Sequence, residues 1–253
     1  MKLVPFLAVA LLPFFAQAAS PANPEKSNPQ VDPEAMASLQ RMSSSLTGAK
    51  AFTVRTKTIL ELPAVTGQFV TLFSTGRIAL ERPNKLRASL TGDAPHFDFY
   101  YDGSTVSAYA PQTNVYSTKP APPTIDAMLD GLRAETGIRF ATGPLLTSDP
   151  AALLTRGLLS AVDVGPSLVD GHLCEHLAFR APGVNWEIWL EPDSRALPRR
   201  LAVTFTDKPG FPRTIVEFSD WNLRPWSLGS FAFTPPTGAK EIPFTSVLKP
   251  TAR

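Results

Sequence analysis

Residues 77–120 constrain the fold more than any other part of the chain, because short alternating segments follow one another there with turn sequences between them. Apolar side chains stand at every second position of two such segments: Leu86, Ala88, Leu90, Phe97, Phe99 and Tyr101. Asp102-Gly103 follows directly, and Asp-Gly supplies the positive backbone angles that a tight hairpin needs. The segment therefore predicts an antiparallel meander with one apolar face and one face toward water.

Strand patterns continue on both sides of this meander. Strands are predicted over residues 51–62 and 68–75 before it, and then near residue 161 and over 172–180, 184–191, 199–207 and 212–222, with one more within 231–242. Residues 69–73 are mostly apolar at successive positions, which predicts a central strand that is covered on both faces. About twelve strands result, and the 26 prolines lie mostly between them.

Apolar residues recur at the spacing of an α-helix in two places, near the N-terminus and in the middle of the chain. Asp32 is a good N-cap before Pro33 at the first helical position, and Gly48 ends the helix that follows. In the middle of the chain, Ile125, Met128, Leu129 and Leu132 stand at i, i+3, i+4 and i+7.

Asp149-Pro150 repeats the helix-start signal ahead of Leu153 and Leu154, which completes a pair of short amphipathic helices. The sequence therefore predicts an α+β fold that is mainly antiparallel β. One large curved sheet carries an N-terminal helix and an inserted helical pair.

Residues 1–18 have the features of a signal peptide. Lys2 precedes an apolar run over residues 3–15, and Ala16-Gln17-Ala18 forms a small-residue cleavage site, so cleavage is expected between Ala18 and Ala19. We expect residues 19–31 to be a flexible leader and residues 32–253 to form a single domain. The residue directly after the cleavage site is Ala19 and not a cysteine, so the mature protein is expected to be soluble, without a lipid anchor, and periplasmic.

Composition and motifs exclude several classes of function. The 253 residues are 43% hydrophobic and carry a net charge of only +2, with no cluster of basic residues, so nucleic acid is not an expected partner. The chain has no G-x-S-x-G sequence and no glycine-rich phosphate loop. Asp98 and Asp102 could form a catalytic carboxylate pair. However, the hairpin turn accounts for an aspartate at position 102, and the solvent-facing side of the strand accounts for one at position 98. We therefore expect no enzymatic activity, no catalytic residue and no cofactor.

His172, Cys174 and His176 would point the same way on a strand, and their side chains are good ligands for Zn or Cu. Side chains on one face of a strand are about 6.5–7 Å apart, however, which is too far for three of them to share one ion. A half-buried strand without a metal is the favoured interpretation. Cys174 is the only cysteine, so it forms no internal disulfide and is expected to be a small buried residue.

A family resemblance rests on motifs spread over most of the mature chain. The motif residues include Gly76, Arg77, Leu80, Arg82, Pro83, Lys85, Arg87, Tyr101, Asp102, Gly103, Tyr109, Pro111, Asn114, Tyr116, Val169, Asp170, Gly171, Arg199, Arg200, Leu201, Phe233, Thr234, Pro235, Pro236, Gly238 and Ala239. In this order they resemble a family of predicted periplasmic proteins, the domain of unknown function 2092. The chain is also similar to the wider superfamily of periplasmic lipoprotein carriers of the LolA and LolB type.

The resemblance implies a half-open β-barrel of about 11–12 strands with a helical lid over an apolar cavity. The implied function is that of a monomeric periplasmic carrier, which binds lipid or the acyl chains of lipoproteins in this cavity and needs no catalytic residue. The residues expected to form the cavity and its lid are Phe52, Val54, Phe69, Phe97, Phe99, Tyr101, Ile125, Met128, Leu129, Leu132, Leu153, Leu154, Trp186 and Ile188.

Two alternatives remain open. The same fold occurs in periplasmic sensor modules that bind a protein partner, so membrane-associated proteins are further candidate partners; a hydrolase is a third and weaker candidate. The helices could also plug a dry core, in which case no ligand would bind.

Overall fold

The computed structural model describes residues 31–93, 96–137, 140–225 and 229–244. The predicted signal peptide, its cleavage site and residues 19–30 of the predicted leader lie outside these residues, so the structure does not describe them.

Twelve strands of the described chain form one sheet. Their bounds are β1 Ala51–Pro63, β2 Phe69–Glu81, β3 Lys85–Gly92, β4 Phe97–Tyr101, β5 Thr105–Ala110, β6 Val115–Pro120, β7 Ser160–Val169, β8 His172–Ala181, β9 Val184–Leu190, β10 Pro198–Thr204, β11 Arg213–Asn222 and β12 Lys240–Glu241. The order across the sheet is β12-β6-β5-β4-β3-β2-β1-β11-β10-β9-β8-β7. All neighbours are antiparallel except β12 and β6. The two end strands, β12 and β7, do not pair with each other, so the sheet stays open.

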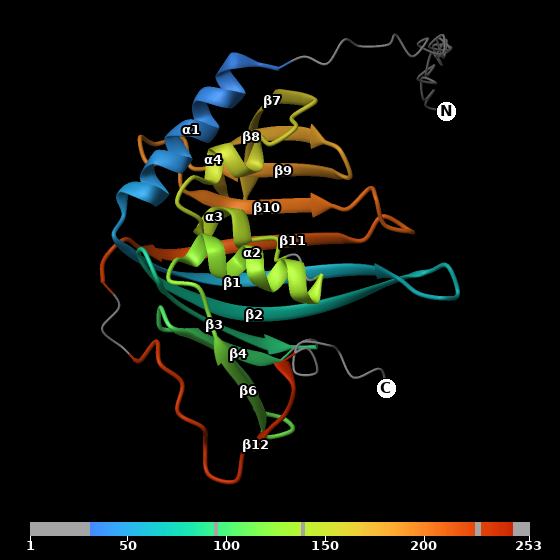
Figure 1. The fold of residues 1–253 in the computed structure, drawn as a ribbon. Helices are drawn as coiled ribbons and strands as arrows, with labels where there is room; N and C mark the ends of the chain where they lie inside the picture. Colours follow the sequence, from blue (N-terminus) through green and yellow to red (C-terminus); the bar gives the residue numbers. More distant parts are fainter. Residues whose placement is uncertain (1–30, 94–95, 138–139, 226–228, 245–253) are drawn as a thin grey trace, which may run out of the picture.

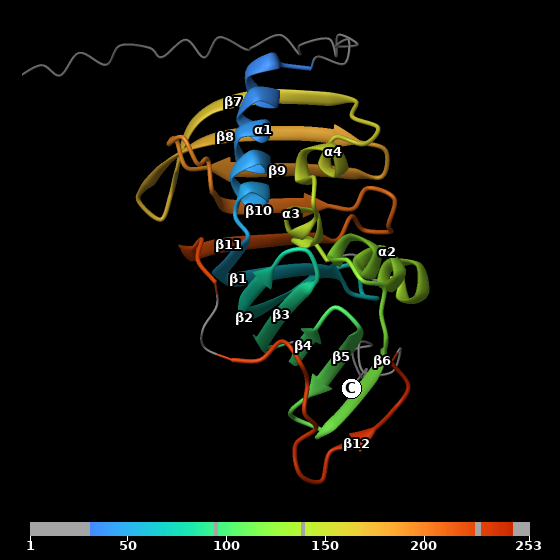
Figure 2. The ribbon, with the colours of Figure 1, turned by 60° about the vertical axis from the view of Figure 1, so that its left-hand side comes forward.

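The helices lie on one face of this sheet, which we call the inner face (Figures 1 and 2). They are α1 Pro33–Gly48, α2 Ile125–Thr136, α3 Gly143–Leu146 and α4 Pro150–Leu154. The predicted fold class is confirmed: a mainly antiparallel α+β protein in which helices cover an unclosed sheet. The middle of the chain holds three short helices where two were predicted, because α3 is an additional single turn.

The predicted helix starts are confirmed by their capping hydrogen bonds. The Asp32 carboxylate accepts a hydrogen bond from the backbone N–H of Glu34 at 2.8 Å, and the Asp149 carboxylate accepts one from Ala152 at 3.0 Å. Thr124 caps α2 in the same way. Each cap satisfies a backbone donor that the first helical turn cannot pair internally.

The core lies between the helices and the inner face. Alternation in the strands directs their apolar side chains to this side, so Phe52 and Val54 of β1 lie in one continuous cluster with Leu39 and Leu46 of α1. All four are at most 1% exposed.

Arg82, which follows β2, fixes the helices relative to one another. Its guanidinium donates hydrogen bonds to the carbonyl oxygen of Leu46 at the end of α1, at 3.2 and 3.4 Å. It also donates to the carbonyl oxygens of Leu146 at 3.1 Å and Thr147 at 2.8 Å, at the end of α3. Burial lowers the pKa of Arg82, and the charge of Asp126 partly offsets this. One side chain therefore satisfies the last carbonyls of two helices.

Three strand predictions need correction. The strand at residues 69–73 is central in the sheet but is not covered twice, since Phe69 is 57% and Phe73 51% exposed. This strand also continues past residue 75 to Glu81, because Gly76 lets β3 approach closely: a Cβ there would lie 2.4 Å from the carbonyl oxygen of Ser89. β10 ends at Thr204, and the last strand is Lys240–Glu241, whereas residues 231–234 are not a strand.

The two Asp-Gly turns differ in their backbone. At the predicted hairpin between β4 and β5, only Gly103 has a positive φ, 98°, while the Asp102 carboxylate accepts hydrogen bonds from the N–H groups of Ser104 and Thr105. The two-residue turn with positive φ at both positions is Asp170-Gly171, at 48° and 77°, between β7 and β8. The hairpin at Asp102 is confirmed, but Asp102 acts through its side chain rather than through a positive φ.

Residues 229–244, which we call the C-terminal strap, wrap around the β6 edge of the sheet (Figure 2). On the outer face, the ring of Phe233 lies 5.2 to 5.8 Å from the rings of Tyr100, Tyr109 and Tyr116. β12 then pairs with β6, and Phe244 is buried in the core of the inner face. At the opposite edge, Val31 forms a β-bridge with Ala161 of β7.

Candidate functional site

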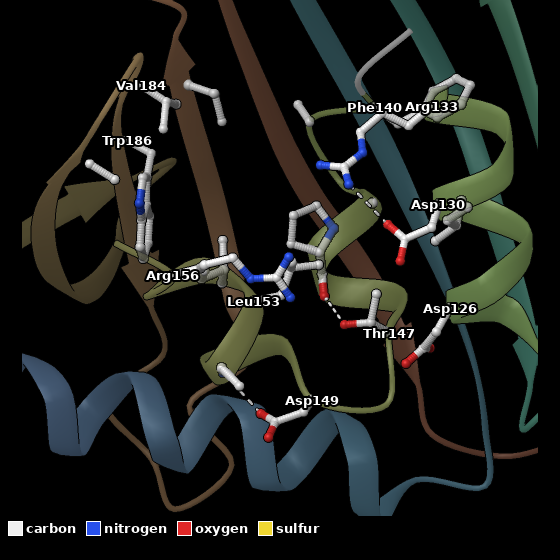
Figure 3. Close-up of a pocket in the computed structure, with 18 of the residues that line it drawn as sticks. Asp126, Asp130, Arg133, Phe140, Thr147, Asp149, Leu153, Arg156, Val184 and Trp186 are labelled. Atoms are coloured by element: carbon white, nitrogen blue, oxygen red, sulfur yellow. Dashed lines mark hydrogen bonds and ion pairs between the residues drawn. The ribbon is translucent and has the colours of Figure 1, made fainter. Parts of the chain in front are cut away.

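An apolar groove of about 430 Å³ opens between the short helices and strands β9 and β10. Figure 3 shows Leu153 of α4 and Trp186 of β9 among its lining side chains. Leu129 of α2 and Phe140 lie on the helical side. On the sheet side, Trp186 is held flat against Phe179 of the neighbouring strand, with ring centroids 3.8 Å apart. The groove therefore has an apolar floor that includes Trp186, and helical walls to which α2, α3 and α4 contribute.

Charged side chains line the mouth of the groove (Figure 3), and most of them are engaged in hydrogen bonds. Asp126 accepts hydrogen bonds from the backbone and hydroxyl of Ser148, Asp149 caps α4, and Arg133 pairs with Asp130 at 3.3 Å. The Arg156 side chain makes no hydrogen bond or ion pair within the described residues. It is therefore available to a polar group at the mouth.

The residues predicted for the cavity and lid fall into three groups. Leu129, Leu153, Leu154 and Trp186 line the groove. Nine others are at most 8% exposed in the continuous core and do not line the groove: Phe52, Val54, Phe97, Phe99, Tyr101, Ile125, Met128, Leu132 and Ile188. In this part of the inner face, helices and sheet are packed against each other, as in the plugged-core alternative.

Phe69 does not reach the groove, so its assignment to the cavity is corrected. It lies at the far end of the β1–β2 hairpin, opposite Pro63, and is 57% exposed. Both strands of this hairpin have 13 residues, whereas the neighbouring strands β3 and β11 have eight and ten, and the hairpin projects beyond them (Figure 1).

Several groove residues were not predicted. Phe140 precedes α3, and Val184, Leu201, Val203 and Phe205 come from β9, from β10 and from just beyond β10. Leu201, Val203 and Phe205 stand at alternate positions, which was a usable signal for one apolar strand face. Alternation alone does not say which strands lie beneath the helices.

His172, Cys174 and His176 do not converge. Cys174 is 1% exposed in a small outer-face cluster with Trp189, and burial raises the pKa of its thiol, partly offset by nearby Arg199. His176 stacks on Trp189 at 4.1 Å and lies 3.0 Å from the Glu187 carboxylate. In the described part of the chain, no three His, Cys, Asp or Glu side chains are placed to hold a metal ion.

Asp98 and Asp102 occupy different surroundings. Burial would raise the pKa of Asp102, but hydrogen bonds from Thr105 and Ser104 outweigh it and hold the pKa below its ordinary value. Burial raises the pKa of Asp98, and nearby Arg87 opposes that rise. The Asp102 carboxylate therefore serves to stabilise the hairpin turn, as expected.

The sequence profile of a family described as "Predicted periplasmic protein (DUF2092)" matches residues 35–245. The chain belongs to this family. No curated protein matches the chain significantly. Within the described residues of this DUF2092 protein, none of the helices has the length and apolar composition required to span a membrane.

Several solved structures are similar to this DUF2092 protein. The lipoprotein LppX of Mycobacterium tuberculosis is 14% identical with a TM-score of 0.50, over 78% of this chain and all of LppX. A LolA superfamily protein of Nitrosomonas europaea is 10% identical with a TM-score of 0.40, over 76% of this chain and 94% of that chain. MucB, in the MucA/MucB complex of Pseudomonas aeruginosa, is 16% identical with a TM-score of 0.38, over 75% of this chain and 56% of that chain. Identities this low bear on the fold alone.

Several of the motif residues that carry the family resemblance have structural roles. Gly76 permits close strand approach, Arg82 ties α1 to α3, and Phe233 anchors the C-terminal strap. Arg77 differs from these three, because its half-buried side chain makes no hydrogen bond or ion pair within the described residues.

Proposed function

We propose that the protein is a periplasmic carrier that holds an acyl chain of a lipid, or of a lipidated protein, in the groove between the short helices and strands β9 and β10. The observation that carries this proposal is the groove itself, whose floor and helical wall are apolar, with Trp186, Leu129 and Leu153 among its lining residues. Its volume of about 430 Å³ lies within the range of small-molecule sites.

The energetics suit reversible binding. Each buried methylene contributes about 0.8 kcal/mol, so about eight methylenes would contribute roughly 6 kcal/mol. The entropy lost when the acyl chain and the helices that line the groove become ordered offsets part of this free energy. The resulting affinity is strong enough for loading and weak enough for release. LppX is named a lipoprotein, and its similarity to this chain supports the fold on which the proposal is built.

Replacement of Leu129 by Asp tests the proposal. A carboxylate in the apolar groove should lower the affinity for a fluorescent fatty acid at least tenfold, because the acyl chain would have to share the groove with a charge. The fold should remain cooperative, since Leu129 is only partly buried. Fluorescence titration measures the affinity, and urea unfolding measures cooperativity.

Leu168→Asp is the matched control, because Leu168 is 68% exposed on β7 and does not line the groove. It should bind the probe as the wild type does. Absence of saturable binding by the wild type, or equal losses in the two variants, would refute the carrier proposal.

A protein-binding function is the second candidate, and an exposed apolar patch favours it. Exposed apolar side chains gather at the tip of the β1–β2 hairpin and in the adjacent β10–β11 loop. Phe69 and Phe73 lie on the outer face of β2, Leu62 and Val70 on the opposite face, and Val65 and Phe211 in the loops. A concentration of exposed apolar residues of this kind marks interaction surfaces. The double variant Phe69→Ser, Phe73→Ser should abolish partner association and leave probe binding unchanged if this candidate is right.

A further inference from the structure

The outer face of the sheet carries a second hollow, of about 730 Å³, that is unrelated to the groove. The turn of the β7–β8 hairpin contributes Val169, Asp170 and His172 to one side of it. The other side is formed by β1, β2, β3, β10 and β11. This side of the sheet faces away from the helices, as the buried inner-face residues of β1 alternate with Arg55 and Lys57.

Cations are concentrated at the floor of this hollow. Arg55 and Arg77 are direct cross-strand partners on β1 and β2, and Lys57 is the next residue on the same face of β1. Directly opposed residues have Cβ atoms about 5 Å apart, and like charges in this arrangement destabilise a sheet. A pair of arginines so placed is therefore an unfavourable contact unless an anion lies between or above them.

The neighbouring carboxylates do not neutralise this pair. Arg55 reaches Asp220 at 3.3 Å, but both side chains are at least 60% exposed, where an ion pair contributes little. Glu217 is held by Arg200 at 2.6 Å and lies 3.6 Å from Lys57. Arg77 has no partner within the described residues.

One cation of the lining is left without an ion pair. Arg55 lies 3.3 Å from Asp220, Lys57 3.6 Å from Glu217 and Arg199 2.9 Å from Glu191. Arg77 has no such carboxylate within the described residues. Hydroxyl groups surround Arg77: Ser89 is its cross-strand partner on β3, and Thr75 and Thr91 lie next along the same face.

We propose that this hollow binds a phosphate ester. Guanidinium groups and hydroxyls are suitable donors to phosphate oxygens, and Arg77 and Arg55 present two guanidinium groups side by side. A phosphate monoester carries a charge of about −1.5 to −2 at neutral pH, so it would offset the repulsion between the two opposed guanidinium groups. The hollow is larger than a phosphate group alone needs, so the esterified part of the ligand fits as well. Soluble phosphate esters and lipid headgroups share this chemistry.

Calorimetric titration of the purified protein with glycerol 3-phosphate, at fixed ionic strength, tests the soluble source. Cosedimentation with phosphatidylcholine vesicles that contain phosphatidic acid tests the lipid source, with pure phosphatidylcholine vesicles as the reference. The test variant is Arg77→Gln. The matched control is Arg180→Gln, which removes the same charge from an exposed position at the far end of β8.

Wild type and Arg180→Gln should bind equally, and Arg77→Gln at least tenfold more weakly, in one or both arms. The arm in which this pattern occurs identifies the source of the phosphate. In chloride buffer, Arg77→Gln should unfold at the same temperature as the wild type or higher, since it relieves the contact with Arg55. Addition of glycerol 3-phosphate or phosphatidic acid should raise the unfolding midpoints of the wild type and of Arg180→Gln, and leave that of Arg77→Gln unchanged.

Absence of saturable binding in both arms, or equal binding by Arg77→Gln and Arg180→Gln, overturns the proposal. The acyl-chain groove lies on the opposite face, so either outcome leaves the Leu129 experiment unaffected.

Discussion

The inner face of the sheet has two parts that the helices cover differently. Where α1 and the buried side of α2 meet the sheet, side chains such as Phe52 and Tyr101 have no exposed surface. Over β9 and β10, the covering helices α3 and α4 have four and five residues and leave a groove of about 430 Å³. A helix of 16 residues such as α1 presents a continuous apolar stripe, whereas single turns joined by loops cannot. Helix length thus decides where the sheet is sealed and where it can accept a ligand.

The boundary between the two parts runs along α2. Met128 is 1% exposed in the sealed part, and its neighbour Leu129 lines the groove. Adjacent residues of one helix therefore allow the comparison to be tested directly.

The largest effect is expected for Met128→Asp. Burial of an unpaired carboxylate should lower the free energy of unfolding by about 4 kcal/mol or more, or prevent folding. Leu129→Asp should cost much less, because its carboxylate can face the groove. Urea unfolding followed by tryptophan fluorescence compares the two. Equal losses would show that α2 has no such boundary.

Arg82→Ala should have the next largest effect, because it leaves the carbonyl oxygens of Leu46, Leu146 and Thr147 without their shared donor. We expect a loss of about 2 kcal/mol in the free energy of unfolding. Binding of the acyl probe should also weaken, since α3 is no longer held to α1. Arg180→Ala, at an exposed position, should change neither quantity; a similar change in both variants would assign the effect to charge alone.

Arg156→Gln should act on ligand binding only. Arg156 stands at the mouth of the groove without a partner among the described residues, so it can attract the carboxylate of a fatty acid. The affinity for the acid should fall about fivefold, or about 1 kcal/mol, as expected for an exposed charge. The affinity for the matching fatty alcohol should not change. A parallel loss for both ligands would assign Arg156 a structural role.

Phe69→Ser should have the smallest effect. The ring is 57% exposed on the projecting hairpin, so the free energy of unfolding should change by no more than about 0.5 kcal/mol. Affinity for the acyl probe should be that of the wild type. Impaired probe binding would place this hairpin at the groove after all.

The sequence predicted the strands and helix starts well because their signals are local. Alternation shows which face of β4 holds Phe97 and Phe99, and Asp32 and Asp149 cap helices through neighbours two or three residues away. The predicted strand ended too early, at residue 75, because a glycine such as Gly76 usually marks the end of a strand. In the structure β2 continues through Gly76, since β3 lies so close at this point that only glycine fits.

The site was predicted only in part, because it depends on which elements meet. Helical spacing treats Met128 and Leu129 alike, although only Leu129 lines the groove. Phe69 was assigned to the cavity because apolar composition predicts burial, but a hairpin longer than its neighbours carries its tip beyond the helices. The lengths of the helices and strands, and their positions in the fold, determine which residues line a groove.

An open sheet has two unpaired edges, and an exposed edge is a template for aggregation. Here each edge is blunted by an end of the described chain: Val31 bridges to β7, and β12 pairs with β6. The residues that protect β6 are synthesised long after β6 itself. A nascent or truncated chain that lacks the C-terminal strap would therefore present the β6 backbone to other copies. Self-association is then a hazard of the incomplete chain, and the strap restricts it once the sheet is assembled.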